Sequence, residues 1–269
     1  MARQKTCINT EKMALYNLDR IHKAMATLAG KEFLEPHDTA SFDCMHYLGD
    51  EALDNAATQL GLQTGDKIID IGSGFSATGR YLHQKYGVDV TGIELQTPIH
   101  ELAQEIIQRN GMSEMVRSIN ADFTQVDLKG PVDHIVSFLC ITHIPDRASV
   151  FRKAAQLLKP GGKMYIEDLY LRGPMDEAMG QLVRDVVQSP ALPSKETYVA
   201  ELTAAGFLDV EFCDMSDVWT RFVTGRTEAY RGKADADPGL LVFYETVSSL
   251  FLSGSLGGVR ITCRIGNQL

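Results

Sequence analysis

The chain has 269 residues, of which 44% are hydrophobic and 23% are charged, close to the averages of soluble globular proteins. The formal net charge is −9 and Lys and Arg form no long run, which argues against binding to nucleic acid or to an anionic membrane surface. No stretch reaches about 18 consecutive apolar residues, and the first residues are not followed by the apolar run of a signal peptide. We therefore expect a cytoplasmic protein that forms one domain over residues 1–269, with no membrane and no nucleic-acid partner.

The cysteines give no sign of a disulfide framework or of a zinc site. They are odd in number, widely spaced, and never arranged as a Cys-x-x-Cys pair. They stand at Cys7, Cys44, Cys140, Cys213 and Cys263. We expect reduced thiols and no bound metal.

The first part of the chain is predicted to form an N-terminal helix followed by a lid. Residues 10–29 place apolar side chains at helical spacing, and Gly30 ends the run. Residues 31–47 lose this periodicity and gather Pro, His, Asp and Ser, which is typical of a loop. Asp50 can cap the next helix, which Gly61 would end.

After Gly61 the pattern becomes a regular alternation of strands and helices. Predicted strands occupy 67–71, 88–93, 115–120, 132–139 and 163–167, and predicted helices occupy 77–86, 98–109 and 147–158. Such an alternation favours right-handed crossovers and a parallel sheet, so we expect a doubly wound α/β core. The later chain has helical stretches at 175–187, 195–205, 217–231 and 240–252, and strand-like runs at 207–213 and 259–265.

A glycine-rich turn gives the strongest functional signal. It begins at Asp70, between a predicted strand and a predicted helix. Gly72 and Gly74 let a ligand approach the backbone where a side chain would block it, and the following helix N-terminus offers free amide donors. Such a turn can be purely structural. Glu94, however, stands 24 residues beyond Asp70 at the tip of the next strand, where a carboxylate can accept both ribose hydroxyls of an adenosine ligand.

Two classes of adenosine ligand fit this turn. Gly72, Gly74 and Ala77 also satisfy a loose dinucleotide-binding fingerprint. A dinucleotide-binding fold would continue with a second mononucleotide-binding half, yet the sequence has no second glycine-rich turn. Instead, Asp122 follows the third predicted strand, in a position that can hold an adenine amino group.

At these positions the chain resembles the class I S-adenosylmethionine-dependent methyltransferases. The matched segments are 68–74 for the glycine motif, 92–94 for the ribose-binding acid, 121–123 for the adenine site, 132–137 for the fourth strand and 157–163 for the turn before the fifth. The resemblance covers about residues 45–170. It implies S-adenosylmethionine as the cofactor and a doubly wound, seven-stranded, Rossmann-like sheet. The last two strands, at 207–213 and 258–264, would form an antiparallel hairpin.

The resemblance also implies which residues hold the cofactor and how the chain is divided. The cofactor-binding residues are Asp70, Gly72, Gly74, Glu94, Leu95, Asp122, Phe123 and Leu139. They belong to a cofactor-binding core at 48–168, which an N-terminal helix and lid at 1–47 precede. Acceptor-binding helices and closing strands at 169–269 complete the same domain.

Within this class the chain is most similar to the small-amine N-methyltransferases of the phosphoethanolamine and sarcosine/dimethylglycine type. The shared segments are 140–146, 198–202, 205–207, 214–219 and Gly257-Gly258. The resemblance implies a small-molecule acceptor whose amine or amino-acid nitrogen takes the methyl group. There are two departures. Leu139 or Cys140 stands where those relatives tend to carry an acid, and no phosphate-gripping cluster of tyrosine and arginine lies between 187 and 195. We expect an acceptor that is neither phosphorylated nor strongly cationic.

His143 is the candidate catalytic residue. Methyl transfer from a sulfonium is an in-line displacement, so the site must align the acceptor lone pair, exclude water and remove a proton where the acceptor has one. His143 follows the fourth predicted strand, where a proton acceptor would be useful. In the alternative interpretation it is a structural histidine that bonds to Asp146 or to the backbone.

Four further residues are candidates for contact with the acceptor. They are His46 and Tyr47 on the predicted lid, Cys140, and the single tryptophan, Trp219. Trp219 could stack over a methylated nitrogen, although a tryptophan between apolar neighbours is more often part of the core. Arg172, Arg221 and Arg226 could bind an acceptor carboxylate or could simply be solvated.

Three alternatives stay open. Cys140, Cys44 and Cys213 could bind arsenite as soft thiolate ligands, which would make the chain an arsenite or thiol methyltransferase. The acceptor atom could instead be an oxygen or a carbon. The chain could also be a non-catalytic S-adenosylmethionine-binding protein, which would need neither a lid nor a base.

Overall fold

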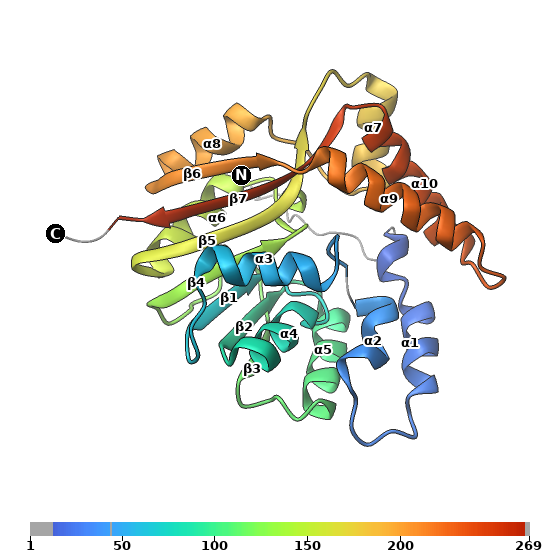
Figure 1. The fold of residues 1–269 in the computed structure, drawn as a ribbon, viewed down its shortest axis with the longest axis horizontal. Helices are drawn as coiled ribbons and strands as arrows, with labels where there is room; N and C mark the ends of the chain where they lie inside the picture. Colours follow the sequence, from blue (N-terminus) through green and yellow to red (C-terminus); the bar gives the residue numbers. More distant parts are fainter. Residues whose placement is uncertain (1–12, 44, 267–269) are drawn as a thin grey trace.

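The fold is built around one seven-stranded sheet. In the computed structural model, which describes residues 13–43 and 45–266, the strand order is β3-β2-β1-β4-β5-β7-β6 (Figure 1). The strands are β1 Lys67–Ile71, β2 Asp89–Glu94, β3 Val116–Asn120, β4 Val132–Phe138, β5 Leu158–Leu171, β6 Phe207–Asp214 and β7 Leu256–Ile265. Strands β1 to β5 are parallel, and β7 runs antiparallel to both β5 and β6. The doubly wound sheet predicted from the sequence is confirmed.

The last strands differ in detail from the prediction. β5 extends well beyond the predicted 163–167, because residues 163–171 pair along their whole length with β7. β6 and β7 are antiparallel neighbours as expected, but they are not joined by a tight turn. Two helices, α9 (Ser216–Arg231) and α10 (Pro238–Leu252), separate them in the sequence.

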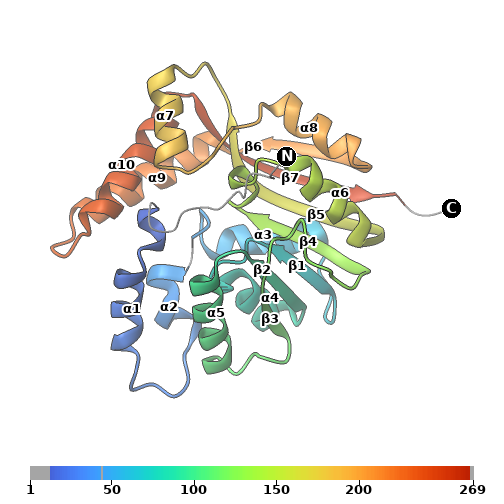
Figure 2. The ribbon, with the colours of Figure 1, turned by 180° about the vertical axis from the view of Figure 1, so that it is seen from behind.

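Helices cover both faces of the sheet (Figures 1 and 2). α3 (Asp50–Leu60) and α4 (Ala77–Tyr86) lie on one face, and α6 (Arg147–Leu157) and α8 (Lys195–Ala204) lie on the other. α5 (Thr97–Arg109) packs against β2 and β3. The strand order reverses between β1 and β4, and open α/β sheets bind ligands beyond the carboxyl ends of the strands at such a point. Among the described residues no helix is both long and apolar enough to cross a membrane.

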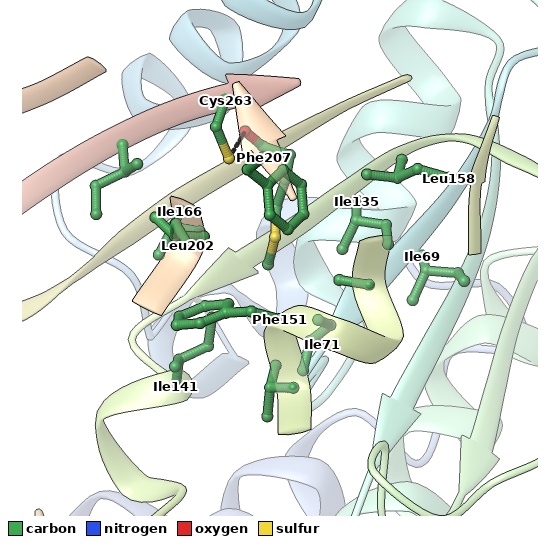
Figure 3. Packing of buried hydrophobic residues seen from close by; sticks show 14 of the residues in the cluster. Ile69, Ile71, Ile135, Ile141, Phe151, Leu158, Ile166, Leu202, Phe207 and Cys263 are labelled. Atoms are coloured by element: carbon green, nitrogen blue, oxygen red, sulfur yellow. Dashed lines mark hydrogen bonds between the residues drawn. The ribbon is translucent and has the colours of Figure 1, made fainter. Parts of the chain in front are cut away.

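The core is built from alternate residues of the buried strands. Ile69 and Ile71 of β1 belong to a cluster that also holds Phe151 of α6 and Leu202 of α8 (Figure 3). Ile68 belongs to a second cluster with α3 and α4. Successive side chains of a strand point to opposite faces, and both faces are covered here, so the central strands read as uninterrupted apolar runs.

The remaining elements flank the sheet at one end (Figures 1 and 2). On one side lie η1 (Ala14–Tyr16), α1 (Leu18–Thr27) and α2 (Pro36–Asp43). On the other side lie α7 (Glu177–Asp185), α9 and α10. Both groups contribute side chains to the pockets at the carboxyl ends of the strands.

The N-terminal helix is shorter than predicted. The sequence pattern favours a helix over 10–29, but α1 begins at Leu18 because the Asn17 side chain accepts a hydrogen bond from the Arg20 amide and caps the helix there. Residues 10–12 lie outside the described residues.

The predicted loop at 31–47 contains a helix, α2, so this expectation is wrong. The buried residues of α2 form no apolar stripe, which is why its periodicity is invisible in the sequence. A buried ion pair between Asp43 and Arg80 of α4 anchors the helix instead. Arg80 also donates to the Asn110 side chain at 2.9 Å, which ties α2 to the end of α5.

Candidate active site

Two adjoining pockets open at the carboxyl ends of β1, β2 and β4. Glu94 lines only one of them and Arg226 lines only the other, so we call them the Glu94 pocket and the Arg226 pocket. The residues that line both are Tyr16, Gly72, Phe138, Leu139 and His143. A ligand in one pocket therefore meets a ligand in the other at the glycine turn and at His143.

The glycine turn forms the wall between β1 and the pockets. Gly72 and Gly74 both have positive φ, 72° and 53°, which residues with a side chain rarely adopt. A Cβ atom on Gly72 would lie only 2.1 Å from the Cys140 sulfur. Glycine is therefore required at position 72 by both conformation and space.

Glu94 places a buried carboxylate at the tip of β2. Its Oε2 accepts a hydrogen bond from the Gly74 amide at 3.0 Å, and its Oε1 accepts one from the Gln96 amide at 2.8 Å. Burial raises the pKa of Glu94, while these backbone donors oppose the shift. Each oxygen keeps a further lone pair, so the carboxylate is oriented and can still accept two ligand hydroxyls.

The rest of the Glu94 pocket is a largely apolar slot. Phe123 is buried, and Leu95 is 40% exposed although it is apolar. The Asp122 Oδ1 accepts hydrogen bonds from the Thr124 amide and hydroxyl at 2.8 and 2.7 Å, which fixes the carboxylate at the rim. An acid at one end, apolar walls and a second acid at the rim match ribose, a flat base and an exocyclic amino group.

Asp70 lies beneath the glycine turn and is buried. Its Oδ1 has no hydrogen-bond partner among the described residues. Burial and the nearby Glu94 carboxylate raise the pKa of Asp70 to about 7. Burial also raises the pKa of Asp168 in β5 to about 7.

The raised pKa values of Asp70 and Asp168 predict that the free energy of unfolding falls as the pH rises. Each carboxyl binds its proton more tightly in the folded chain than at its ordinary pKa of 3.8, so its contribution is full below that pH and is lost through about pH 7. We expect the melting temperature to fall between about pH 4 and pH 7 and the fall to be smaller in Asp70→Asn. Scanning calorimetry checks this, with exposed Asp235→Asn as the control. Identical slopes in Asp70→Asn and the wild type would contradict it.

His143 is held at the junction of the pockets by the short helix η2 (Ile141–His143). Its Nδ1 lies 3.0 Å from the carbonyl oxygen of Gln188, which can only accept, so Nδ1 carries the hydrogen and Nε2 keeps its lone pair. Burial lowers the pKa of His143, and backbone hydrogen bonding with Gln188 and Leu139 opposes that shift. Leu139 and Gln188 both have positive φ, 51° and 58°, an uncommon conformation that often marks functional loops.

Asp168 fixes the loop that carries His143. Its Oδ2 accepts hydrogen bonds from the Thr142 amide at 2.8 Å and from the Tyr198 hydroxyl at 3.0 Å. The Thr142 hydroxyl lies 3.0 Å from the Ser189 hydroxyl, which also contacts the Thr142 carbonyl. Gln188, the residue before Ser189, hydrogen-bonds to the His143 ring. The segments that carry His143 and Gln188 are therefore bonded to each other at two neighbouring positions.

The four candidate acceptor residues do not all gather in one pocket. His46 and Tyr47 line the Arg226 pocket. Cys140 lines the Glu94 pocket instead, because its side chain points toward Gly72. Trp219 is fully buried and belongs to neither set of lining residues. Its ring packs against Tyr47, with centroids 4.8 Å apart, so it supports the pocket wall from behind.

Two lining residues were not singled out as site residues in the sequence. Tyr16 lies between the pockets, and burial, Glu94 and Cys140 together raise the pKa of its hydroxyl. Tyr16 lies within residues 10–29, where the sequence pattern predicted a helix and gave no sign of a binding site. Arg226 lines the second pocket from α9, and three arginines were equally plausible from the sequence alone.

The family comparison is consistent with this geometry. The model described as Mycolic acid cyclopropane synthetase matches residues 43–223, which is more than half of the chain. The match extends from the end of α2 into α9 and includes β1 to β5. The chain belongs to this family.

Similar proteins include several methyltransferases. Phosphoethanolamine N-methyltransferase 1 of Triticum aestivum is 32% identical over 186 residues, 67% of this chain and 36% of that protein. Methyltransferase GfsG of Streptomyces halstedii is 26% identical over 184 residues, 67% of this chain and 66% of that protein. Further relatives are named as methyltransferases of nitrogen and oxygen. The chain spans about two thirds of the length of Methyltransferase GfsG and about one third of the length of the Triticum aestivum enzyme.

Solved structures show the same fold. Haemonchus contortus phosphoethanolamine N-methyltransferase 2, in complex with phosphomonomethylethanolamine and S-adenosylhomocysteine, has a TM-score of 0.78 to this chain. The alignment covers 95% of this chain and 58% of that chain, at 20% sequence identity. The resemblance seen in the sequence is confirmed for the fold and the family.

Proposed function

We propose that the chain is an S-adenosylmethionine-dependent methyltransferase that acts on a small molecule, with an amine or amino-acid nitrogen as the acceptor atom. The observation that carries the proposal is the pair of adjoining pockets that share the glycine turn and His143. One pocket has the shape and polarity for a nucleoside, and the other is left for the acceptor. Relatives named as N-methyltransferases support the choice of nitrogen.

The residues present fit the cofactor. Glu94 would accept the ribose hydroxyls, Asp122 would meet the adenine amino group, and Phe123 would pack against the base. The glycine turn would let the cofactor pass close to the backbone toward the second pocket. When bound, S-adenosylmethionine supplies an electrophilic methyl group on a positively charged sulfur.

His143 would act on the acceptor from the junction. Its Nε2 lone pair can take a proton from an acceptor in the Arg226 pocket, because the Gln188 carbonyl fixes the other nitrogen as the donor. The rings and aliphatic side chains around it, including Phe138 and Leu139, would keep water away from the reacting atoms. Tyr16 closes the junction from the N-terminal side.

The described structure does not support the alternative in which three cysteines bind arsenite. The Cys140 thiol has a pKa raised by burial and by the carboxylates of Glu94, Asp168 and Asp70, so it stays protonated at neutral pH. Cys213 is exposed on the edge strand β6 and lines neither pocket. Cys44 lies outside the described residues.

The experiment that tests the proposed function is a screen for S-adenosylhomocysteine release. Purified protein with S-adenosylmethionine is offered amines, amino acids, hydroxylated compounds, thiols and arsenite, one at a time. Turnover with amines or amino acids supports the proposal, and turnover with a different class changes the acceptor atom. A chain that binds the cofactor but turns over no acceptor would instead fit a binding protein.

Ligands are expected to protect the covering segments from hydrogen exchange. Residues 31–47 and 170–231 would together cover the methyl donor, since the parallel strands alone leave their carboxyl edge open to water. Amides in both segments should exchange more slowly with S-adenosylhomocysteine and acceptor than without them. The loop at 61–66, at the amino end of β1 and away from both pockets, serves as the internal reference. Equal exchange in both states would show that these segments are not a lid.

A further inference from the structure

Arg226 brings a positive charge into the Arg226 pocket, and no residue in the described part of the chain pairs with it as an anion. It comes from α9 and lines the pocket together with Phe243 and Val247 of α10. Its Nε and Nη2 atoms are buried and have no hydrogen-bond partner among the described residues. Buried guanidinium donors are normally satisfied, because removing them from water without a partner costs free energy.

Aromatic rings hold this guanidinium in place. Its Cζ atom lies 4.2 Å from the ring centroid of Tyr244, 5.1 Å from that of Tyr47 and 5.6 Å from that of Phe222. Cation–π contacts of this kind position the group and keep water off it. They leave the N–H donors on Nε and Nη2 unused, and a pair of in-plane guanidinium donors matches the two oxygens of a carboxylate.

The rest of the pocket favours a carboxylate over a phosphate or a cation. Arg226 is the single arginine or lysine among the described residues that line it, whereas a phosphate dianion is usually gripped by several donors. Two carboxyls also line the pocket. Asp43 pairs with Arg80, and Asp70 lies under the glycine turn with its pKa raised to about 7. Apolar side chains such as Leu169, Val187 and Val247 fill much of the remaining wall.

We propose that Arg226 is the specificity-determining residue of this pocket, and that the acceptor is a carboxylic acid with an apolar body. Its carboxylate would pair with Arg226 and its reacting atom, uncharged when it attacks, would lie at the His143 end. This inference rests on the proposed function, which makes this pocket the acceptor site.

The test compares two simple probes, octanoate and octanamide, which have the same chain length and differ in charge. Binding to the protein, with and without S-adenosylhomocysteine, is measured by calorimetry. The wild type is expected to bind octanoate about ten- to a hundredfold more tightly than octanamide, the range for a charge-assisted hydrogen-bonded pair. Arg226→Met, which keeps a long side chain against the rings, should lose this preference. Arg226→Lys should keep part of it, and Arg221→Met, an exposed arginine of the same helix, should keep all of it.

The outcomes separate this inference from the proposed function. Equal affinity of the wild type for both probes would overturn the carboxylate assignment, and this comparison needs no variant to fold. A weaker affinity of Arg226→Met for S-adenosylhomocysteine would also overturn it, because the arginine would then serve the cofactor's own carboxylate. If S-adenosylhomocysteine fails to bind the wild type, the proposed function fails, while the probe comparison without it still decides the role of Arg226.

Discussion

Replacing Glu94 with alanine is expected to weaken S-adenosylhomocysteine binding about 100-fold or more. The Glu94 carboxylate is already oriented by the Gly74 and Gln96 amides, so it would meet two ribose hydroxyls without rearrangement. Hydrogen bonds to a charged acceptor contribute about 1.5–3 kcal/mol each, and about 1.4 kcal/mol corresponds to a tenfold change in affinity. Two such bonds therefore give the expected factor.

Calorimetry on the purified variants makes this measurement. Glu94→Gln keeps the size of the side chain and one acceptor, so it should bind with an intermediate affinity. Glu101→Ala, an exposed acid on the neighbouring helix α5, should bind like the wild type. Melting temperatures show whether Glu94→Ala is folded. An unchanged affinity in a folded Glu94→Ala would remove the Glu94 pocket as the cofactor site.

The parallel core could be predicted from the sequence because its elements repeat a simple physical pattern. Strand β1 and helix α4 have the predicted bounds, since an apolar strand, a glycine turn and an amphipathic helix follow one another without interruption. The position of Glu94 at the tip of β2 was predicted from the same alternation of strands and helices. Elements fixed by local periodicity and turn chemistry are therefore the ones that the sequence reveals.

The parts that were missed depend on long-range contacts. Helix α2 owes its position to the pair between Asp43 and Arg80, which are 37 residues apart in the chain. The direction of the Cys140 side chain depends on the empty space at Gly72, where a Cβ atom would lie 2.1 Å from the Cys140 sulfur. None of these contacts produces a periodic pattern of residues in the sequence.

The acceptor side was the least predictable part of the site for a related reason. His143 was found from its position after the fourth strand and Tyr47 from its place on the predicted lid, but Arg226 comes from a helix inserted between β6 and β7. Arg221 and Arg226 both belong to α9, so which of the two enters the pocket depends on how α9 is rotated against α10. That rotation is decided by packing around Trp219 and Phe251, with ring centroids 6.4 Å apart.

Replacing His143 with alanine is expected to lower kcat by roughly 100-fold or more while leaving S-adenosylhomocysteine affinity unchanged. The ring lies between the two pockets, with Nδ1 donating to the Gln188 carbonyl and Nε2 as the nitrogen that bears the lone pair. The measurement is turnover with the acceptor found by screening, alongside calorimetry for the cofactor and melting temperatures. His22→Ala, an exposed histidine of α1, serves as the matched control.

The pH profile separates a base from a histidine that only supports the loop. Burial disfavours the imidazolium, so the pKa of His143 lies below 6.5, and the neutral base is present at every pH above that value. For the wild type, kcat/KM should therefore rise with pH through a midpoint below 6.5, and this limb should be absent in His143→Ala. An amine acceptor would add a second limb at higher pH in both proteins, because it must lose its own proton before it attacks. Equal turnover of the two proteins with a lowered melting temperature in His143→Ala would assign the ring a structural role.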